Sequence, residues 1–579
     1  MVIPFPLRKS IMKRLLILLI LIEFLANPII CQADLELLPG WPQTFEDDPL
    51  FGTGKGGIVM IDLSSDSNSE IILGCSNCIY ILNQYGDPLP NWPQCTAFIA
   101  NKQPSIGDID NDGEYEIVAS VSDPLGGERG RIYSWELDGT IIFFKDVKEF
   151  ASIPLLYDII GDPSCEIIVN SYEDNKLFVL YGNGDDVNGW PRNIIAASNP
   201  TAGDVDNDGI TEIFAFSFEE LFYYAKLNCF NPMGEPCADF TFSIEVDTSR
   251  HIVISDYGGV SLGDADLDGF LDIMIQYSTA ENLWDFDSFR YVLYNNGEIW
   301  NNWPVYYESD VNYALVVSDV VNGNNLELIS STGISDEYHL FDTNGEFVSG
   351  WPTFPNDGSA HSQPVVGDID GDGELEIIFG NNHFDENYIG YLWAFNGDGS
   401  VVEDFPLRQE GTTGYFSPAL GDINNDGLLD IVFISDVSSD SGRFKTIWAY
   451  TFNVPYDTTL LPWPMNGHDP QHTFNYNFRM PASVNDGKTP NLPSVITLTN
   501  HPNPFNSATV IEYVVEDKGK VQLEIYNLLG QRVAKLVDDE ISPGKHSVRW
   551  NADGFSSGIY FSVLKTGDVK HSRRMVLLK

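Results

Sequence analysis

The sequence predicts an all-β protein in which one repeated sheet unit fills most of the chain and a smaller β domain follows it. Two observations carry this prediction. Short apolar strands alternate with turns throughout, without helical periodicity of any length, and an aspartate-rich loop recurs five times. The five loops are Gly107–Ile117 (GDIDNDGEYEI), Gly203–Ile213 (GDVDNDGITEI), Gly263–Ile273 (GDADLDGFLDI), Gly367–Ile377 (GDIDGDGELEI) and Gly421–Ile431 (GDINNDGLLDI).

Every unit has the same order of elements. A proline precedes most loops, an apolar strand follows the loop, and an aromatic strand such as Tyr391–Phe395 comes next. A Gly-rich turn such as Asn396–Gly399 then leads to a closing strand at a Trp-Pro or Phe-Pro step. We therefore expect short antiparallel strands in each unit. The steps are Trp41-Pro42, Trp92-Pro93, Trp190-Pro191, Trp303-Pro304, Trp351-Pro352, Phe405-Pro406 and Trp463-Pro464.

Three further positions carry a worn copy of the loop, beginning at Asp62, Asp158 and Asp319. With these included, eight first aspartates follow one another at steps of 46 to 60 residues. This period fits the four-stranded blade of a β-propeller, a ring of sheets that leaves only short, protected edges. We predict eight blades between Trp41 and Trp463, or seven if one worn unit is an insertion.

The intact loops and their period resemble FG-GAP/VCBS repeats, the family that includes the integrin-α propeller. The resemblance covers residues 40–475 and rests on the five loops quoted above. It implies a β-propeller, but it does not specify a function, because one fold serves many functions.

The spacing of oxygens in the loop fits calcium, which takes about six to eight oxygen ligands. Side chains at loop positions 1, 3 and 5 point inward, glycine at position 6 allows the backbone to reverse, position 7 offers a carbonyl, and the acid at position 9 closes the site. The loop resembles the start of an EF-hand loop, although strands flank it and an EF-hand closes at position 12. The predicted ligands of about five Ca²⁺ ions are Asp108, Asp110, Asp112, Glu114 and Glu116; Asp204, Asp206, Asp208, Ile210 and Glu212; Asp264, Asp266, Asp268, Phe270 and Asp272; Asp368, Asp370, Asp372, Glu374 and Glu376; and Asp422, Asn424, Asp426, Leu428 and Asp430.

An ordinary Asp-Gly turn without an ion is the alternative for each loop. Five repetitions of the full spacing favour calcium, because clustered carboxylates without an ion repel each other and raise each other's pKa. Magnesium fits poorly because it keeps several waters. We predict a structural role for the ions, since all ligands come from the protein. Whether the worn loops at Asp62, Asp158 and Asp319 bind ions is left open.

Charge is distributed unevenly along the chain. Of 31 Lys+Arg and 84 Asp+Glu, residues 34–480 hold 15 basic and 73 acidic residues, so this part repels nucleic acid and anionic lipid. Residues 1–33 are predicted to be a signal peptide, because basic residues precede an apolar run and Cys31-Gln32-Ala33 offers a cleavage site before Asp34. A lipoprotein at Cys31 and a start at Met12 are alternatives. No later segment is apolar enough to span a membrane.

Six cysteines remain after the signal peptide, which permits disulfides in an exported protein. Cys229 and Cys237 could close a small loop. Cys75 and Cys78 have the spacing of half a zinc site or a redox pair, but no second pair follows at zinc spacing, so thiols or a local disulfide on a turn are favoured.

Residues 480–497 are predicted to be a linker, and residues 498–579 a small β-sandwich. Alternation of apolar residues predicts strands at Val521–Tyr526 and Gln531–Val537, and another strand pair at His546–Trp550 and Gly558–Leu564.

This C-terminal segment resembles the type A sorting domain of the type IX (Por) secretion system. The residues that carry the resemblance are Asn503–Asn506, Ile525–Gly530, Pro543-Gly544 with Trp550, Ser557–Tyr560 and Arg574–Lys579. The resemblance implies the type IX machinery as a partner and passage across the bacterial outer membrane to the cell surface or the medium.

No nucleophile elbow, P-loop, HExxH motif or dinucleotide fingerprint occurs, so we predict no catalytic residues. His468 and His472 follow the last Trp-Pro step and are expected to cap the ring. We expect a non-catalytic module that binds an extracellular protein or polysaccharide. The Cys229/Cys237 loop and Tyr277–Tyr291 are expected to build its face, with plain variation in loop length as the alternative. The alternative is a polysaccharide-active enzyme resembling rhamnogalacturonan lyases, which the scarcity of basic residues in 34–480 disfavours.

Overall fold

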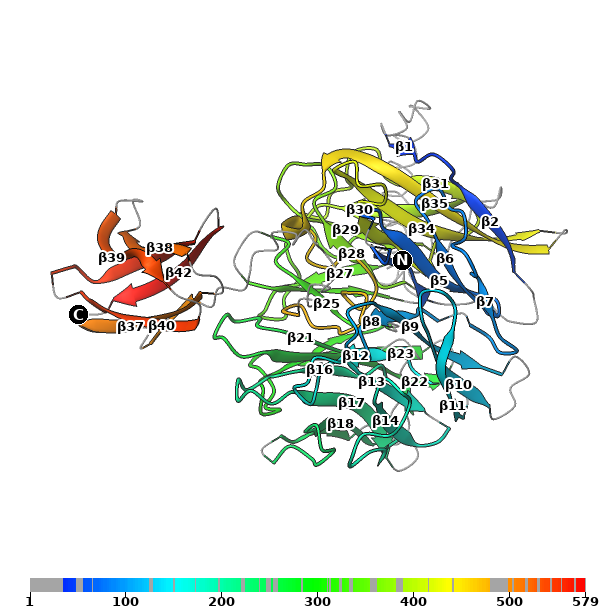
Figure 1. Ribbon diagram of the computed structural model, residues 1–579, viewed down its shortest axis with the longest axis horizontal. Helices are drawn as coiled ribbons and strands as arrows, with labels where there is room; N and C mark the ends of the chain where they lie inside the picture. The colour runs from blue at the N-terminus through cyan, green and yellow to red at the C-terminus, as the bar shows by residue number, and fades with distance from the viewer. Residues whose placement is uncertain are drawn as a thin grey trace, which may run out of the picture. The chain divides into compact units, whose positions relative to one another are not determined.

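The computed structural model describes most of the chain after the predicted signal peptide (Figure 1). Residues 1–33 and the linker predicted at 480–497 lie outside the described residues. The described residues are 35–47, 56–64, 66–100, 102–123, 129–148, 151–171, 173–195, 198–219, 224–238, 240–245, 251–253, 259–282, 285–309, 311, 314–321, 325–332, 337–354, 362–381, 389–414, 416–439, 442–478, 498–501, 505–515, 519–527, 532–541, 544–552, 554–566 and 569–577.

The chain forms two compact units, residues 1–485 and 486–579, and the described part of both is all-β. A single 3-10 turn, Thr458–Leu460, is the only helical element among the described residues. No helix in this part of the chain is long and apolar enough to cross a membrane. The first unit consists mainly of eight antiparallel sheets, which we number I to VIII in chain order.

Sheets I to IV each have four strands. Sheet I contains β4 (Val59–Ile61), β5 (Glu70–Cys75), β6 (Cys78–Leu82) and β7 (Gln94–Cys95); sheet II contains β8 (Ser105–Gly107), β9 (Glu116–Ser122), β10 (Gly130–Trp135) and β11 (Ile141–Val147); sheet III contains β12 (Leu155–Tyr157), β13 (Glu166–Ser171), β14 (Lys176–Leu180) and β15 (Arg192–Asn193); sheet IV contains β16 (Thr201–Gly203), β17 (Glu212–Glu219), β18 (Tyr224–Phe230) and β19 (Phe242–Glu245).

Sheet VII has the same four-strand order, whereas sheets V, VI and VIII depart from it. Sheet V contains β20 (His251–Val253), β21 (Val260–Gly263), β22 (Asp272–Asn282), β23 (Asp285–Leu293) and β24 (Val305–Tyr307); sheet VI contains β25 (Val316–Ser318), β26 (Glu327–Ser331) and β27 (Tyr338–Phe341); sheet VII contains β28 (Val365–Gly367), β29 (Glu376–Gly380), β30 (Ile389–Phe395) and β31 (Leu407–Glu410); sheet VIII contains β33 (Ala419–Gly421), β34 (Leu428–Ser439) and β35 (Gly442–Pro455), with β1 (Glu36–Leu37) and β2 (Gln43–Asp47) paired to β35. A short parallel pair joins β3 (Gly56–Gly57) to β32 (Phe416–Ser417).

The acidic loops occupy the same place in all eight sheets. Each loop, intact or worn, connects a short strand of three or four residues to a longer partner, as Asp108–Tyr115 connects β8 to β9. The longer strands are buried on both faces; every residue of β5, β13 and β29 is buried. A strand with no solvated face lies between two neighbouring layers, which explains why these segments are continuous apolar runs.

The segment Trp463–Tyr476 lies against the short strands of most sheets. Its carbonyl oxygens accept hydrogen bonds from the backbone N–H of Ile106 (2.8 Å), Leu156 (3.0 Å) and Leu262 (2.9 Å), which belong to sheets II, III and V. Val366 of sheet VII, Leu420 of sheet VIII and the Thr201 hydroxyl of sheet IV donate to it as well. The short strands of six sheets therefore meet at one segment of chain.

The two ends of the first unit pair with each other. The N-terminal β2 forms an antiparallel pair with β35, and in Figure 1 the blue β2 lies beside the yellow β35. On the loop side, the Ser69 N–H of sheet I donates to the Ile423 carbonyl of sheet VIII at 2.9 Å. Sheet I is thus the neighbour of sheet VIII as well as of sheet II.

Tryptophans of the Trp-Pro steps tie neighbouring sheets together. In each of five steps the indole N–H donates to a backbone carbonyl in the turn that follows the third strand of the next sheet. The pairs are Trp41 with Gln84, Trp92 with Leu137, Trp190 with Pro232, Trp303 with Thr343 and Trp351 with Gly397, at 2.7–3.1 Å. The first of these pairs links sheet VIII to sheet I.

The residue before the step has a left-handed backbone conformation, with a φ of +95° at Gly350. This glycine lies so close to the next sheet that an added Cβ would overlap the Asp398 carbonyl oxygen. Glycine is required here for two reasons, the backbone angle and the close approach of the neighbouring turn.

The second unit has two antiparallel sheets around a core centred on Trp550. One sheet contains β36 (Leu498–His501), β37 (Ala508–Val515) and β40 (Gly544–Asn551); the other contains β38 (Gly519–Asn527), β39 (Arg532–Ile541), β41 (Gly558–Thr566) and β42 (Val569–Leu577). The strands predicted at Val521–Tyr526 and Gln531–Val537 pair as β38 and β39.

One predicted pairing in this unit is wrong. The segments His546–Trp550 and Gly558–Leu564 are strands, but β40 pairs with β37 and β41 pairs with β38 and β42, so the two lie in different sheets. Alternation of apolar residues identifies a strand with one buried face, and it does not say which strand lies beside it.

We predict that Gly350→Ala destabilises the first unit by about 3 kcal/mol, because it adds a backbone overlap to the cost of a left-handed alanine. Gly161→Ala is the matched control: its φ is +80° and nothing lies within 4 Å of an added Cβ, so it should cost only about 1 kcal/mol. Urea unfolding of the purified chain measures both variants. Equal losses would show that the close approach to Asp398 is unimportant.

Candidate metal centres

The intact loops share one set of internal hydrogen bonds. The first aspartate accepts from the N–H of the glycine at position 6, as Asp108 does from Gly113 at 3.1 Å and Asp422 from Gly427 at 2.9 Å. The glycine has a positive φ, +89° at Gly113. This turn wraps the backbone around the first carboxylate, and glycine at position 6 permits the left-handed conformation.

Four loops bring three carboxylates close enough to share an ion. In each, one oxygen from positions 1, 3 and 9 lies within 4.8 Å of the others. The groups are Asp108, Asp110 and Glu116; Asp204, Asp206 and Glu212; Asp264, Asp266 and Asp272; and Asp368, Asp370 and Glu376. These four clusters could hold a metal ion.

The other predicted ligands are placed differently. The position-5 aspartates lie outside the four groups, and each accepts a hydrogen bond from the N–H at position 7, as Asp112 does from Glu114 at 2.8 Å. The same bond links Asp208 to Ile210, Asp268 to Phe270, Asp372 to Glu374 and Asp426 to Leu428. In the last loop Asn424 stands at position 3, and its Nδ2 donates to Asp426 at 3.0 Å. Asp422 and Asp430 supply the remaining carboxylates of that loop.

Several buried carboxylate oxygens of the loops have no hydrogen-bond partner among the described residues. At position 9, Glu116 and Glu376 use Oε2 to accept the N–H of position 2, at 2.8 Å in both cases. Their Oε1 atoms are buried and have no hydrogen-bond partner among the described residues, and the same holds for Asp430 Oδ1 and Asp264 Oδ1. An unpartnered buried carboxylate oxygen is costly, so this donor set fits a cation.

The pKa values of the closing acids are raised in the absence of an ion. Burial is the largest cause, and repulsion from the other loop carboxylates adds to it. The pKa is raised to about 8 for Glu116, Asp272 and Glu376, and to about 7 for Glu212 and Asp430. At neutral pH each loop therefore needs either a proton or a cation.

The three worn loops, which the sequence identified as copies of the unit, keep part of this geometry. Glu70, Glu166 and Glu327 are buried at position 9 and accept the same hydrogen bond from position 2, at 2.7, 3.0 and 2.8 Å. The signal was present in the sequence, because an acid stands at position 9 in all eight copies. Burial raises the pKa of Glu166 and of Glu327 to about 7.

The cysteines and the two histidines singled out in the sequence lie in disulfides or in packed parts of the first unit. Disulfides join Cys229 to Cys237 and Cys78 to Cys95, while Cys75 and Cys165 are buried and form no disulfide. His468 and His472 lie in the Trp463–Tyr476 segment, and His468 Nδ1 is 2.9 Å from an Asp469 oxygen. The segment Tyr277–Tyr291 forms most of the β22–β23 hairpin.

The comparisons with known proteins identify the second unit. Residues 500–578 match the family model of the secretion system C-terminal sorting domain. This match confirms the resemblance to type IX sorting domains. It indicates that the chain interacts with the type IX machinery and is exported to the cell surface or the extracellular space.

Several solved structures are similar to this chain at low sequence identity. They include the biofilm matrix protein Bap1 of V. cholerae (12% identity, 78% of this chain and 96% of that chain covered, TM-score 0.34). PorZ of Porphyromonas gingivalis, a surface component of the type IX system (12%, 88% and 69%, TM-score 0.28), and the α-L-arabinofuranosidase Arb93a of Fusarium graminearum (10%, 60% and 92%, TM-score 0.30) are others. No curated protein matches. At these scores the similarities carry no functional assignment.

Glu166 provides a test of the buried acids that avoids the intact loops. Its pKa is about 7 when folded and 4.5 ordinarily, so the folded state binds the proton more tightly than the unfolded chain does. The resulting stabilisation is complete below about pH 4.5 and is lost as the pH rises through about 7. In chelator, Glu166→Gln should therefore gain about 1–3 kcal/mol of stability relative to wild type between pH 5 and pH 8.

Thermal unfolding across this pH range measures the difference. Glu298→Gln is the control, because Glu298 is exposed. The difference in stability between this variant and wild type should not change with pH. If the stability difference between Glu166→Gln and wild type is also independent of pH, a raised pKa at this buried position is contradicted.

Proposed function

We propose that the first unit is an eight-bladed β-propeller, stabilised by calcium, which acts outside the cell as a non-catalytic binding or adhesion module. The sorting domain carries it there. The observation that carries the proposal is the repetition of one unit, strand–acidic loop–strand, in all eight sheets of the described chain, with the short strands of six of them meeting at Trp463–Tyr476.

Three contacts support a closed ring. β2 completes sheet VIII from the other end of the chain, Ser69 joins the loops of sheets I and VIII, and Trp41 of sheet VIII donates to Gln84 of sheet I. In a ring, every sheet has two neighbours, which accounts for strands buried on both faces. Eight sheets favour eight blades over seven.

Calcium is supported by the donor set. Each of four loops gathers three carboxylate oxygens from positions 1, 3 and 9, and the fifth offers two carboxylates and an amide at the same positions. Hard oxygen ligands in a flexible loop suit calcium better than zinc, which prefers nitrogen and sulfur. The ion would replace the proton that the buried acids otherwise need at neutral pH. Because all these ligands come from one turn, the ion would hold the turn between the two strands.

The ligand of the module is an extracellular protein or polysaccharide. A polysaccharide lyase remains the competing function, and product formation separates the two. Incubation of the purified chain with pectic polysaccharides in calcium should give binding without new unsaturated ends, which absorb in the ultraviolet. Appearance of such ends would replace the binding module with the enzyme.

Removal of calcium should lower the melting temperature of the first unit by many degrees, because a ligand that binds only the folded state stabilises it by mass action. Differential scanning calorimetry of the full exported chain, with and without chelator, measures the shift. An unchanged melting curve in excess chelator would contradict the proposal.

Single substitutions locate the ions. Asp370→Asn should reduce the number of calcium ions bound by one of about five, since Asp370 belongs to one of the carboxylate groups. Asp162→Asn, in a worn loop, is the control and should leave that number unchanged. Equilibrium dialysis with radioactive calcium gives the count, and an unchanged count for both variants would exclude the loop as a site.

Removal of residues 500–578 should stop export. In a bacterium with a type IX system, the truncated chain is expected to accumulate in the periplasm, because the sorting domain is what the machinery recognises. Cell fractionation and antibody labelling of intact cells follow the chain. A truncated chain that still reaches the surface would show that sorting depends on another segment.

A further inference from the structure

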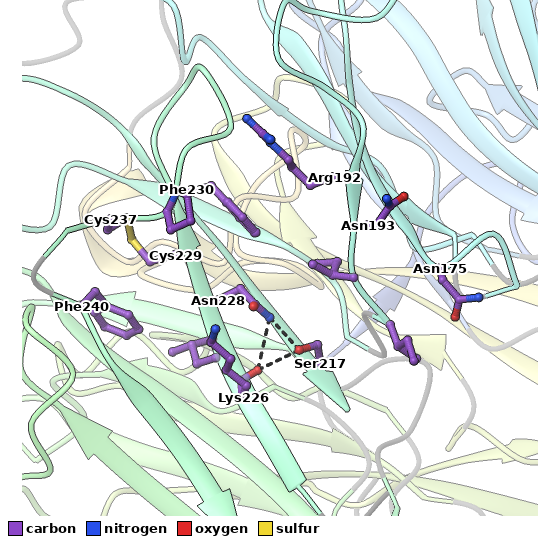
Figure 2. Close-up of a pocket in the computed structure, with 14 residues that line it drawn as sticks. Asn175, Arg192, Asn193, Ser217, Lys226, Asn228, Cys229, Phe230, Cys237 and Phe240 are labelled. Atoms are coloured by element: carbon purple, nitrogen blue, oxygen red, sulfur yellow. Dashed lines mark hydrogen bonds between the residues drawn. A yellow bond between two sulfur atoms is a disulfide. The ribbon is translucent and has the colours of Figure 1, made fainter. Parts of the chain in front are cut away.

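A cleft of about 730 Å³ lies between sheets III and IV (Figure 2). One wall comes from β15 and the residues that follow it, and the other from β18 and the Cys229–Cys237 disulfide. None of its lining residues belongs to an acidic loop. Its volume is in the range of small-molecule sites, about 300–1,000 Å³.

The charge of the cleft is opposite to that of the surrounding protein. Residues 34–480 contain 73 acidic and 15 basic residues, yet the described residues that line the cleft include Arg192 and Lys226 and no acid. Arg192 Nη2 donates to the Met233 carbonyl at 3.1 Å, and its Nε is buried without a partner. Lys226 is exposed. A concave site of one charge attracts ligands of the other, so the cleft suits an anion.

The remaining lining is polar and aromatic in a mixed pattern. Asn228 is 9% exposed, and its Nδ2 donates to Ser217 Oγ at 2.7 Å and to the Ala215 carbonyl at 3.1 Å, which fixes the floor (Figure 2). The exposed amides of Asn175 and Asn193 lie at the margin. The half-buried Phe240 adds apolar ring surface beside the disulfide, whereas Phe230 is only 7% exposed.

We propose that this cleft binds a carboxylated saccharide, such as a uronic acid unit of a polysaccharide. Arg192 and Lys226 meet its carboxylate, the amides meet its hydroxyl groups, and the Phe240 ring meets its apolar face. This inference rests on the proposed function, since it takes the exported unit to be a binding module, and it names the ligand class.

An acidic peptide fits the cleft less well. Peptides bind to sheets mainly by adding a strand to a free edge, where backbone hydrogen bonds give the affinity. The outer strand at the cleft, β15, has only two residues. Recognition here therefore depends on side chains, and amides and cations suit a rigid ring with hydroxyl and carboxylate groups.

Isothermal titration of the full exported chain in calcium tests the proposal with three probes. The α-1,4-linked trimer of galacturonic acid should bind. The α-1,4-linked galactose trimer carries neutral hydroxymethyl groups in place of the carboxylates, and it should bind about ten- to a hundredfold more weakly, as expected for lost hydrogen bonds to charged groups. Hexaglutamate carries carboxylates on a peptide and should not bind.

Variants assign the binding to the cleft. Lys226→Gln removes an exposed cation without touching the core, and it should weaken binding of the acidic trimer about tenfold. Arg192→Gln should do the same, although Lys226→Gln decides the matter if the loss of the Met233 hydrogen bond affects folding. Arg408→Gln is the control, because it removes one exposed cation from sheet VII and should leave the affinity unchanged.

Three outcomes would overturn the proposal: no binding of the acidic trimer, equal binding of both trimers, or unchanged affinity in Lys226→Gln. Binding of hexaglutamate alone would assign the cleft to acidic peptides instead. Each of these leaves the proposed function intact if calcium still stabilises the chain and other extracellular ligands bind. Loss of calcium stabilisation together with intact binding of the acidic trimer would overturn the proposed function and keep the cleft.

Discussion

A buried carboxylate at the start of the longer strand is the constraint on which the first unit depends. In all eight sheets this acid is at most 8% exposed and accepts the N–H of loop position 2. The bond fixes the turn between two strands, but it uses only one carboxylate oxygen. A buried charge of this kind is stable only when it is neutralised, and a proton or a cation must therefore accompany each turn.

The two kinds of loop meet this requirement differently. Intact loops place carboxylates at positions 1 and 3 beside the buried acid, which supplies oxygens for a cation. The worn loop at Asp158 has Ile160 at position 3, so its Glu166 has fewer oxygens beside it and is left with the proton. If the calcium proposal holds, the same turn is expected to respond to metal in the intact loops and to pH in this worn loop.

Neighbouring sheets are joined by contacts that differ in their tolerance of change. In five of the steps the tryptophan donates to a turn in the next sheet, and the preceding residue approaches that turn so closely at Gly350 that no side chain fits. The segment Trp463–Tyr476 adds hydrogen bonds to six sheets from one place in the chain. Substitutions are therefore expected to be tolerated best away from these contacts, for example at the outer strand β15 beside the cleft.

The sequence by itself determined the local units. The loop spacing identified the turns and the acids in them, alternation identified the strands, and the sorting motifs identified the exported C-terminal unit, because each depends on residues close together in the chain. It did not determine which strands pair, as β40 and β41 illustrate, or that Cys78 bonds to Cys95 and not to Cys75. It also gave no sign that Arg192 and Lys226 share a cleft. Those outcomes depend on how distant segments pack, and only the tertiary structure brings their side chains together.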